Sequence, residues 1–443
     1  MNDTFLIDVV EWLASDASDP LESVTNAEIA ISIGQNRVTE VEDFQSKTVR
    51  KTIRASAGLV AMWILNNWWR ILCEPDSDTA LDKDLNWRMS HVMPAIGGGY
   101  VWPDLIFKGS DGSHIYAECK RSSYRDVDTY SPIRYLNEFS TSIPVETFEK
   151  SVSSFVERVL DRLAACGLRK TDLHDMWNDV QYERINAKAS QYRRLEALLG
   201  IDPDEQETLI STLLRKWSKS IGIQALEEIS AATDSVQIEN VLSSAKEVSQ
   251  SVKTFGKLPD LGYLDKGSTA PWQQGQKAAY ELRKLWELSS GPIKDVVLAD
   301  RLEMNSAKLN EVKTAAPFSL AVRGKADDRV GFVLKRPRHE SRRFDIARLI
   351  GDHIFHEGGA PLRPATNALT IRQKFQRAFA AEFLCPSEMI KERFSVIPGR
   401  SLRGGLVTDL STEYEVSEQL IFHHMENRDV LSHSVAQDAL LFA

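Results

Sequence analysis

The stretch from residue 100 to 120, YVWPDLIFKGSDGSHIYAECK, constrains the fold of this 443-residue chain more than any other. The runs YVWPDLIF and HIYAEC are rich in β-branched and aromatic residues, and KGSDGS between them is typical turn sequence. The pattern therefore predicts a β-hairpin. A turn symmetric about Asp111 would place Asp104 opposite Glu118, with facing Cβ atoms about 4.5–5.5 Å apart.

The second strand of this hairpin is amphipathic. Because side chains alternate between the two faces of a strand, Glu118 and Lys120 share one face. The other face carries apolar residues that can enter a core: Ile115, Ala117 and Cys119. We therefore expect Asp104, Glu118 and Lys120 to converge on the face that points away from the core.

Two facing carboxylates repel each other unless a cation lies between them. Mg²⁺ or Mn²⁺ suits such hard oxygen ligands, which makes Asp104 and Glu118 candidate metal ligands. The ammonium group of Lys120 could then orient the attacking water and stabilise charge that develops on a phosphate. The alternative is an edge hairpin with solvated carboxylates, one of which pairs with Lys120.

These residues resemble the PD-(D/E)XK nuclease superfamily, here as Pro103-Asp104, thirteen intervening residues, then Glu118-Cys119-Lys120. The resemblance implies a mixed sheet flanked by helices and metal-dependent cleavage of DNA, less often of RNA. It also implies an upstream acidic residue, for which Glu74 and Glu42 are candidates.

The chain is expected to have three parts. Residues 1–143 form the nuclease-like α/β domain, and 144–256 form a helical connector. A Gly- and Pro-rich linker opens the third part, 257–443. The connector begins with a predicted helix at 144–167 that has six apolar residues at helical spacing: Phe148, Val152, Phe155, Val156, Val159 and Leu163.

The third part resembles the ImmA/IrrE family of metallopeptidase-like proteins, through the order and spacing of RRFDIARLIGDHIFH, FAAEFLCP and EYEVSEQLIFHHMEN. The resemblance implies an α+β zincin-like fold in which an H-E-x-x-H helix binds zinc. Here Arg348, Leu349 and Asp352 stand at the first histidine, the glutamate and the second histidine. The third ligand position falls among Gln373 and Phe375, so zinc is not expected.

Two further interpretations of this helix concern its charged residues. Arg348 and Asp352 are four residues apart and can form an ion pair where the histidines would stand. A rival metal site could use His353, His356 and Glu357, although HIFHE matches neither H-E-x-x-H nor its inverted form.

Composition adds general limits. The net charge of −9 argues against a basic nucleic-acid coat but allows a local acidic metal site flanked by basic clusters such as KRSSYR and KRPRHESRR. Four widely spaced cysteines favour a reducing cytoplasm. The apolar runs are too short to cross a bilayer, so no membrane partner is expected.

The function expected is a metal-dependent nuclease, acting on DNA and gated by a catalytically degenerate ImmA/IrrE-like sensor domain that binds a protein or peptide. The resemblances alone suggest a setting in phage defence or the stress response. One alternative is a non-enzymatic regulatory or protein-binding scaffold. A second is an active ImmA/IrrE-type metallo-endopeptidase.

Overall fold

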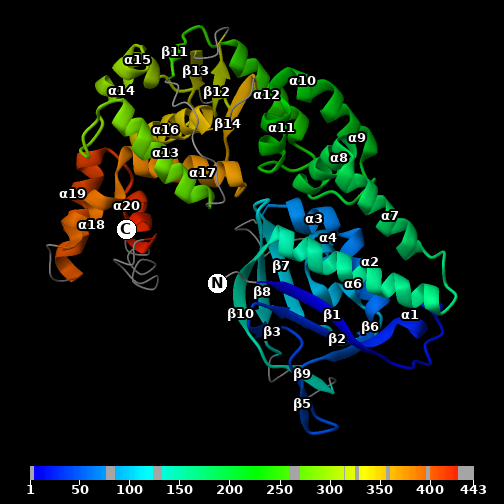
Figure 1. The fold of residues 1–443 in the computed structure, drawn as a ribbon. Coiled ribbons are helices and arrows are strands. Elements are labelled where there is room, and N and C mark those ends of the chain that lie inside the picture. The colour runs from blue at the N-terminus through cyan, green and yellow to red at the C-terminus, as the bar shows by residue number, and fades with distance from the viewer. Residues whose placement is uncertain are drawn as a thin grey trace. The chain divides into compact units, whose positions relative to one another are not determined.

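The computed structural model describes residues 4–75, 85–122, 132–258, 270–313, 315–324, 329–355, 360–395 and 400–427. The chain divides into two compact units, whose elements are labelled in Figure 1. Unit 1 is Met1–Thr212 with Ala368–Thr370, and unit 2 is Leu213–Asn367 with Ile371–Ala443. Both units mix helices and strands, which confirms the expected α/β character. Unit 1 extends past residue 143, and unit 2 begins inside the expected connector.

Unit 1 contains both strands and helices. Its strands are β1 (Phe5–Trp12), β2 (Asn26–Ile33), β3 (Asn36–Arg37), β4 (Val41–Asp43), β5 (Thr48–Arg50), β6 (Ile53–Ser56), β7 (Asp104–Ser110), β8 (His114–Lys120), β9 (Ile133–Tyr135) and β10 (Phe139–Pro144). Its helices are α1 (Pro20–Thr25), α2 (Ala57–Asn66), α3 (Trp68–Cys73), α4 (Leu85–His91), the 3₁₀ helix η2 (Met93–Ile96), α6 (Val145–Ala165), α7 (Asp172–Ile185), α8 (Ala187–Leu198) and α9 (Glu207–Thr212).

The strands of unit 1 form three small sheets. Their orders are β1-β2-β3 with β6 on β2, then β10-β8-β7, and β5-β4-β9. Each of these pairs is antiparallel. A parallel pair, which a mixed sheet requires, is not among the strand pairs of the described part of unit 1.

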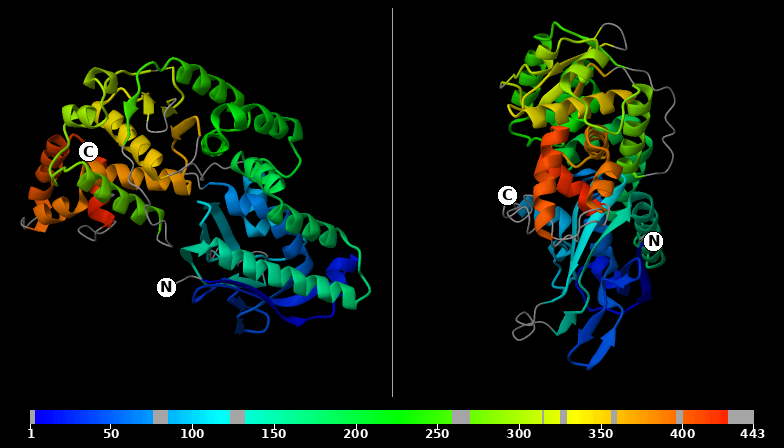
Figure 2. Two further views of the ribbon diagram at one scale, coloured as in Figure 1. Left: turned by 45° about the horizontal axis from the view of Figure 1, so that its top comes forward. Right: turned by 90° about the vertical axis from the view of Figure 1, so that its left-hand side faces the viewer.

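The predicted helix at 144–167 is confirmed as α6, and its six apolar residues are its buried ones. Helix α6 lies along β1 (Figure 2), where the Ser151 hydroxyl accepts the Ile7 N–H at 3.0 Å. All six side chains are at most 1% exposed. Full burial stabilises the fold by about 1.5–3 kcal/mol for each large apolar side chain, so the periodicity accounts for which face of α6 is buried.

Unit 2 surrounds a four-stranded antiparallel sheet of order β11-β13-β12-β14. These strands are β11 (Gly256–Lys257), β12 (Ser319–Arg323), β13 (Arg329–Val333) and β14 (Leu362–Ala365). Its helices are the π-helix η3 (Leu213–Trp217), α10 (Ser218–Ile221), α11 (Ile223–Ser230), α12 (Ile238–Gln250), α13 (Pro271–Leu285), α14 (Asp295–Arg301), α15 (Ser306–Leu309), α16 (His339–Phe355), α17 (Ile371–Leu384), α18 (Ser387–Ser395), α19 (Arg400–Tyr414) and α20 (Glu418–Asn427).

Helices α13 and α16 both pack against α17 and enclose the core of unit 2. The contact between α16 and α17 depends on a small residue, because a Cβ atom on Gly351 would overlap the ring of Phe379. Most of the expected linker, 259–269, lies outside the described residues. Within the described ranges, no helix combines the length and the apolar character needed to cross a membrane.

Candidate functional site

The predicted hairpin is present as β7 and β8, and an aspartate holds its turn. The Asp111 carboxylate accepts hydrogen bonds from the N–H groups of Ser113 and His114, both at 2.8 Å, and from the Tyr116 hydroxyl at 2.8 Å. Gly112 has φ +89°, a left-handed conformation that glycine adopts without strain. These contacts explain why the turn forms where the sequence predicts it.

The register of the hairpin differs from the symmetric expectation. Asp104 faces Lys120, and a β-bulge between Phe107 and Gly109 shifts the pairing. The expected facing pair of Asp104 and Glu118 is therefore wrong. A bulge adds one unpaired residue to one strand, and the alternating hydrophobic pattern does not reveal it. Asp104 and Glu118 become diagonal neighbours, for which Cα separations of about 7–8 Å are typical.

The predicted division of β8 into two faces is confirmed. Ile115, Ala117 and Cys119 are at most 2% exposed and belong to the core of unit 1. The side chains of Glu118 and Lys120 are 23% and 50% exposed. The hairpin thus presents its charged residues on the face that does not enter the core.

Glu118 lies between two lysines. Its Oε2 atom is 2.5 Å from Lys108 Nζ, and its Oε1 atom is 3.8 Å from Lys120 Nζ. Burial raises the pKa of Asp104; the positive charges of Lys120 and Arg88 oppose this rise, and the negative charge of Glu118 adds to it. Asp104 and Glu118 are therefore close enough to repel each other, and three basic side chains surround them.

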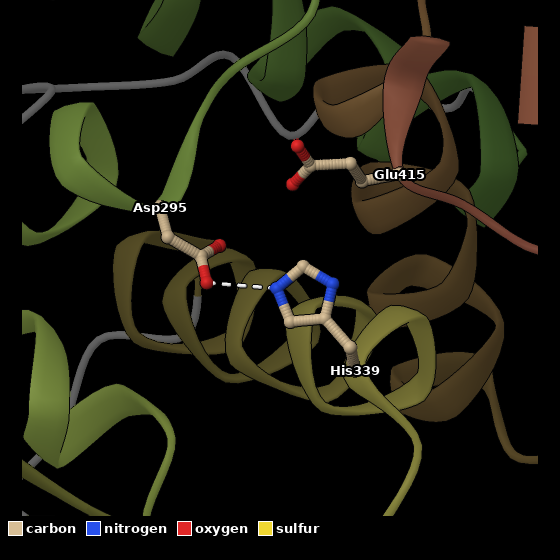
Figure 3. Close-up of side chains that lie close together, drawn as sticks. All are labelled: Asp295, His339 and Glu415. Carbon is tan, nitrogen blue, oxygen red and sulfur yellow. Dashed lines mark hydrogen bonds and ion pairs between the residues drawn. The ribbon is translucent and has the colours of Figure 1, made fainter. Parts of the chain in front are cut away.

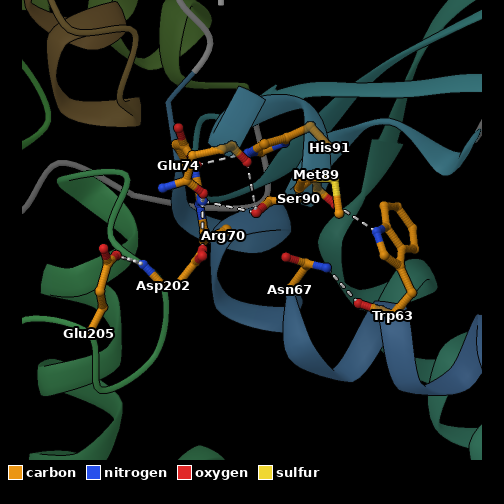
Figure 4. A network of polar contacts seen from close by, with 10 residues as sticks. Trp63, Asn67, Arg70, Glu74, Met89, Ser90, His91, Asp202 and Glu205 are labelled. Carbon is orange, nitrogen blue, oxygen red and sulfur yellow. Dashed lines mark hydrogen bonds and ion pairs between the residues drawn. The ribbon is translucent and has the colours of Figure 1, made fainter. Parts of the chain in front are cut away.

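Glu74 does not extend this site. Its backbone carbonyl accepts the Ser110 N–H at 2.7 Å, so it lies at the far end of β7, about 20 Å along the strand from Asp104. Its carboxylate accepts hydrogen bonds from Arg70 Nε and His91 Nε2, both at 2.8 Å (Figure 4). Burial would raise the pKa of Glu74, but His91 and Arg70 outweigh it and lower the pKa to about 2.

Arg70 extends this buried network in unit 1 (Figure 4). Its Nη1 atom donates to Asn86 Oδ1 at 2.7 Å, to Ser90 Oγ at 2.9 Å and to Asp202 Oδ1 at 2.7 Å. The sequence pattern did not predict this network. The one local signal was the spacing of Arg70 and Glu74, four residues apart on adjoining turns. The network joins α3, α4 and the loop after α8, and its geometry is that of a structural brace.

Glu42, the other upstream candidate, lies in β4 and forms an ion pair with Arg134 of β9. The charged groups that act on Asp104 are Lys120, Arg88 and Glu118, and Glu42 is not among them. In the described part of unit 1, neither upstream candidate therefore joins Asp104 and Glu118 as a third acidic residue.

In unit 2, the resemblance assigns the zinc motif to positions whose side chains are buried. These side chains contact other groups of the protein. Leu349 is fully buried in the hydrophobic core. Arg348 is 4% exposed, and its Nη2 atom donates to Gln373 Oε1 at 2.5 Å and to the Thr366 carbonyl at 2.6 Å. Burial lowers the pKa of Arg348 to about 10, despite the nearby charge of Asp345.

Asp352 has cationic partners other than the one predicted. Its carboxylate receives two hydrogen bonds from Arg372, at 2.5 and 2.6 Å, and Arg363 Nη1 lies 3.5 Å away. Arg348 lies 3.6 Å from Asp345, one turn earlier, and the charge of Asp352 also acts on it. The guanidinium of Arg372 donates two parallel N–H groups to the two oxygens of the Asp352 carboxylate. This bidentate interaction is stronger than the expected ion pair within α16.

A group of three possible metal ligands also occurs in unit 2 (Figure 3). One ligand atom each of Asp295, His339 and Glu415 lie within 4.8 Å of one another. Arg343, however, donates to Asp295 and lies 3.2 Å from Glu415, and Lys294 lies 2.7 Å from Glu415. These cations already neutralise both carboxylates, so the geometry is that of an ion-pair cluster joining α14, α16 and the turn before α20.

Two residues of the rival metal site around His353, His356 and Glu357, lie outside the described residues. Comparisons with protein-family models, with curated proteins and with solved structures found no match for this chain.

Proposed function

We propose that this protein is a metal-dependent nuclease acting on DNA, with its reaction centre on the β7–β8 hairpin. The observation that carries the proposal is the presence of Asp104, Glu118 and Lys120 on one accessible face of the hairpin. The residues fit the superfamily motif in type, order and shared face. On this face, Asp104 lies opposite Lys120 and is a diagonal neighbour of Glu118.

The donor set suits a hard divalent cation. Asp104 and Glu118 offer carboxylate oxygens, which are hard ligands. Burial raises the pKa of Asp104, and the negative charge of Glu118 adds to this rise, so a cation between the two carboxylates would be favourable. They would hold Mg²⁺ or Mn²⁺, and Lys108 would have to leave Glu118 when the cation binds. The bound cation would neutralise phosphate charge and acidify the attacking water.

The remaining residues position the phosphate and the water. Lys120 stands opposite Asp104 and can orient the water and stabilise negative charge on the phosphoryl oxygens. Water then replaces one ester oxygen at phosphorus, and the departing oxygen takes up a proton. Arg88 adds positive charge that attracts the sugar-phosphate backbone.

Unit 2 is proposed to be a zincin-like domain without peptidase activity that binds a protein or peptide and gates the nuclease. Arg348, Leu349 and Asp352 offer neither the two imidazoles nor the general base that a zinc peptidase needs. An active metallo-endopeptidase would therefore require other ligands. Near-stoichiometric zinc in the purified protein would revive that candidate.

The test is cleavage of plasmid DNA, single-stranded DNA and RNA in Mg²⁺ or Mn²⁺. Asp104→Asn and Lys120→Ala should each reduce cleavage by at least about 100-fold, a typical loss when a metal ligand or charge-stabilising group is removed. Asp161→Asn and Lys150→Ala, on the exposed face of α6, are matched controls that should retain activity. Equal activity in all variants would refute the assignment.

A non-enzymatic regulatory scaffold is the second candidate, and one observation favours it. Lys108 already balances the charge of Glu118, so the hairpin can be stable without a metal ion. The two candidates differ in their response to cations. A nuclease site should make the midpoint of thermal unfolding rise with added Mn²⁺, because a ligand that binds the native state stabilises it. A scaffold should show no such rise.

A further inference from the structure

Gln373 of α17 is the centre of a buried hydrogen-bond network in unit 2. Its Oε1 atom accepts from Arg348 Nη2 at 2.5 Å and from the Thr366 N–H at 3.0 Å. Its Nε2 atom donates to Glu228 Oε2 at 2.9 Å and to the Pro364 carbonyl at 3.1 Å. Glu228 belongs to α11, so a carboxylate from a distant segment occupies one of the two donor positions of this amide.

The most deeply buried charges of the network balance one another when Glu228 is counted. Six charged side chains of the network are less than 9% exposed: Arg348, Arg363, Arg372, Asp345, Asp352 and Glu228. Five of them come from α16, β14 and α17, and these five sum to three positive and two negative charges, or +1. Glu228 supplies the missing negative charge. Without α11, these buried side chains would carry an excess positive charge and the Gln373 amide would lose its Glu228 acceptor, and both changes suit a carboxylate.

The attachment of α11 to α17 is polar. Gln224 Oε1 accepts from Arg372 Nη1 at 3.2 Å, and Glu228 accepts from Gln373. The buried apolar side chains of α11 lie outside the hydrophobic core that α13, α16 and α17 share: Ala225, Leu226 and Ile229. A contact made by buried charged groups gains little net stability, because desolvation offsets most of the attraction. Another carboxylate can therefore compete for it.

We propose that Gln373 and Arg372 form a carboxylate-binding site that Glu228 fills, and that an acidic segment of a partner protein binds there in place of α11. The class of ligand follows from what the site now holds. Glu228 follows Glu227 in the chain, and the charges of both act on Arg372. A peptide with adjacent acidic residues reproduces this arrangement. One carboxylate accepts the Gln373 amide, and the charge of Arg372, whose fork stays on Asp352, attracts the other.

This inference refines the ligand-sensing role proposed for unit 2, but its test measures binding and is independent of DNA cleavage. The probe is fluorescein-labelled hexaglutamate, titrated by fluorescence anisotropy into the full chain. Glu228→Ala removes the internal competitor and should tighten binding by about 10-fold or more, since the competing closed state reduces the apparent affinity. Glu239→Ala, at an exposed position on α12, should bind as the wild type does.

Two further variants separate the site from general charge attraction. Adding Arg372→Gln with Asp352→Asn to Glu228→Ala should abolish the gain. The paired change removes one positive and one negative charge, and Arg363 keeps its hydrogen bond to the backbone carbonyl of residue 352. Glu228→Gln keeps a hydrogen-bond acceptor and provides a folded variant if Glu228→Ala unfolds; it should bind more tightly than the wild type. Unchanged affinity in both Glu228 variants, or equal binding of labelled hexaglutamine, would overturn the proposal.

Discussion

The Nε2 atom of His91 lies 2.8 Å from Oε2 of Glu74 (Figure 4), and its Nδ1 atom lies 2.8 Å from the carbonyl oxygen of Phe107. Both partners are acceptors, and a neutral imidazole has only one N–H group. The two hydrogen bonds together therefore require a doubly protonated ring. His91 is fully buried, so Glu74, which also accepts from Arg70, is its carboxylate partner in the interior of unit 1.

The first prediction concerns the acid stability of unit 1. Because the pKa of Glu74 is lowered from 4.5 to about 2, its ionised form stabilises the folded state. This contribution to the free energy of unfolding is complete above about pH 4.5 and is lost as the pH falls towards 2. Glu74→Gln should cost on the order of 3 kcal/mol of unfolding free energy at pH 7. Urea unfolding at several pH values should show this difference shrinking in acid, whereas the exposed control Glu157→Gln should change little. A difference independent of pH would contradict the assignment.

The second prediction concerns metal binding at the hairpin. Lys108 pairs with Glu118 at 2.5 Å and competes with any cation for that carboxylate. Lys108→Ala should tighten Mn²⁺ binding about 3-fold to 5-fold, which corresponds to the energy of up to about 1 kcal/mol of a half-exposed ion pair. Isothermal titration calorimetry measures the change, with Lys150→Ala as the control. Weaker Mn²⁺ binding in Lys108→Ala would mean that this lysine supports the site.

The third prediction concerns thiol reactivity. Burial raises the pKa of Cys119 and of Cys385 to about 12, whereas Cys166 is exposed. Because the thiolate is the reactive form, iodoacetamide at pH 8 should modify Cys166 at least about 100-fold faster than the two buried thiols. Peptide mapping by mass spectrometry measures the rates, and denaturant should make them similar. Rapid native modification of Cys119 would show that the inner face of the hairpin is open.

The fourth prediction concerns the contact between α16 and α17. A Cβ atom on Gly351 would overlap the Phe379 ring, so Gly351→Ala should destabilise unit 2 by about 1–3 kcal/mol. Gly405 of α19 has open space around it, so Gly405→Ala should be neutral or stabilising by up to about 1 kcal/mol, because alanine favours a helix. Thermal unfolding compares the two variants, and equal midpoints would show that the close packing at Gly351 is relaxed in solution.

The parts of the fold that the sequence predicts well are those with a local cause. The six apolar residues of α6 recur at helical spacing, and all six are buried. The hairpin turn has two local causes. The Asp111 carboxylate accepts the His114 N–H, three residues later, and Gly112 adopts the positive φ that the turn requires. The inward face of β8 follows from the two-residue period, which any antiparallel partner preserves.

The candidate site was predictable in its residues but not in its pairing. The motif locates Asp104, Glu118 and Lys120, and alternation puts Glu118 and Lys120 on one face. The bulge near Gly109 then decides which residues face each other, because one inserted residue changes the register without changing the pattern.

The ionic partners depend on packing between distant segments. Spacing along α16 allowed Arg348 to pair with Asp352, yet Asp352 binds Arg372, twenty residues later in the chain. Gln373 reaches Glu228 across 145 residues, and Arg70 reaches Asp202 across 132. Helical and strand periods act over a few residues and so specify the elements and their buried faces. A buried charge takes the partner that packing brings within hydrogen-bond distance, because leaving it unpaired in the interior costs several kcal/mol.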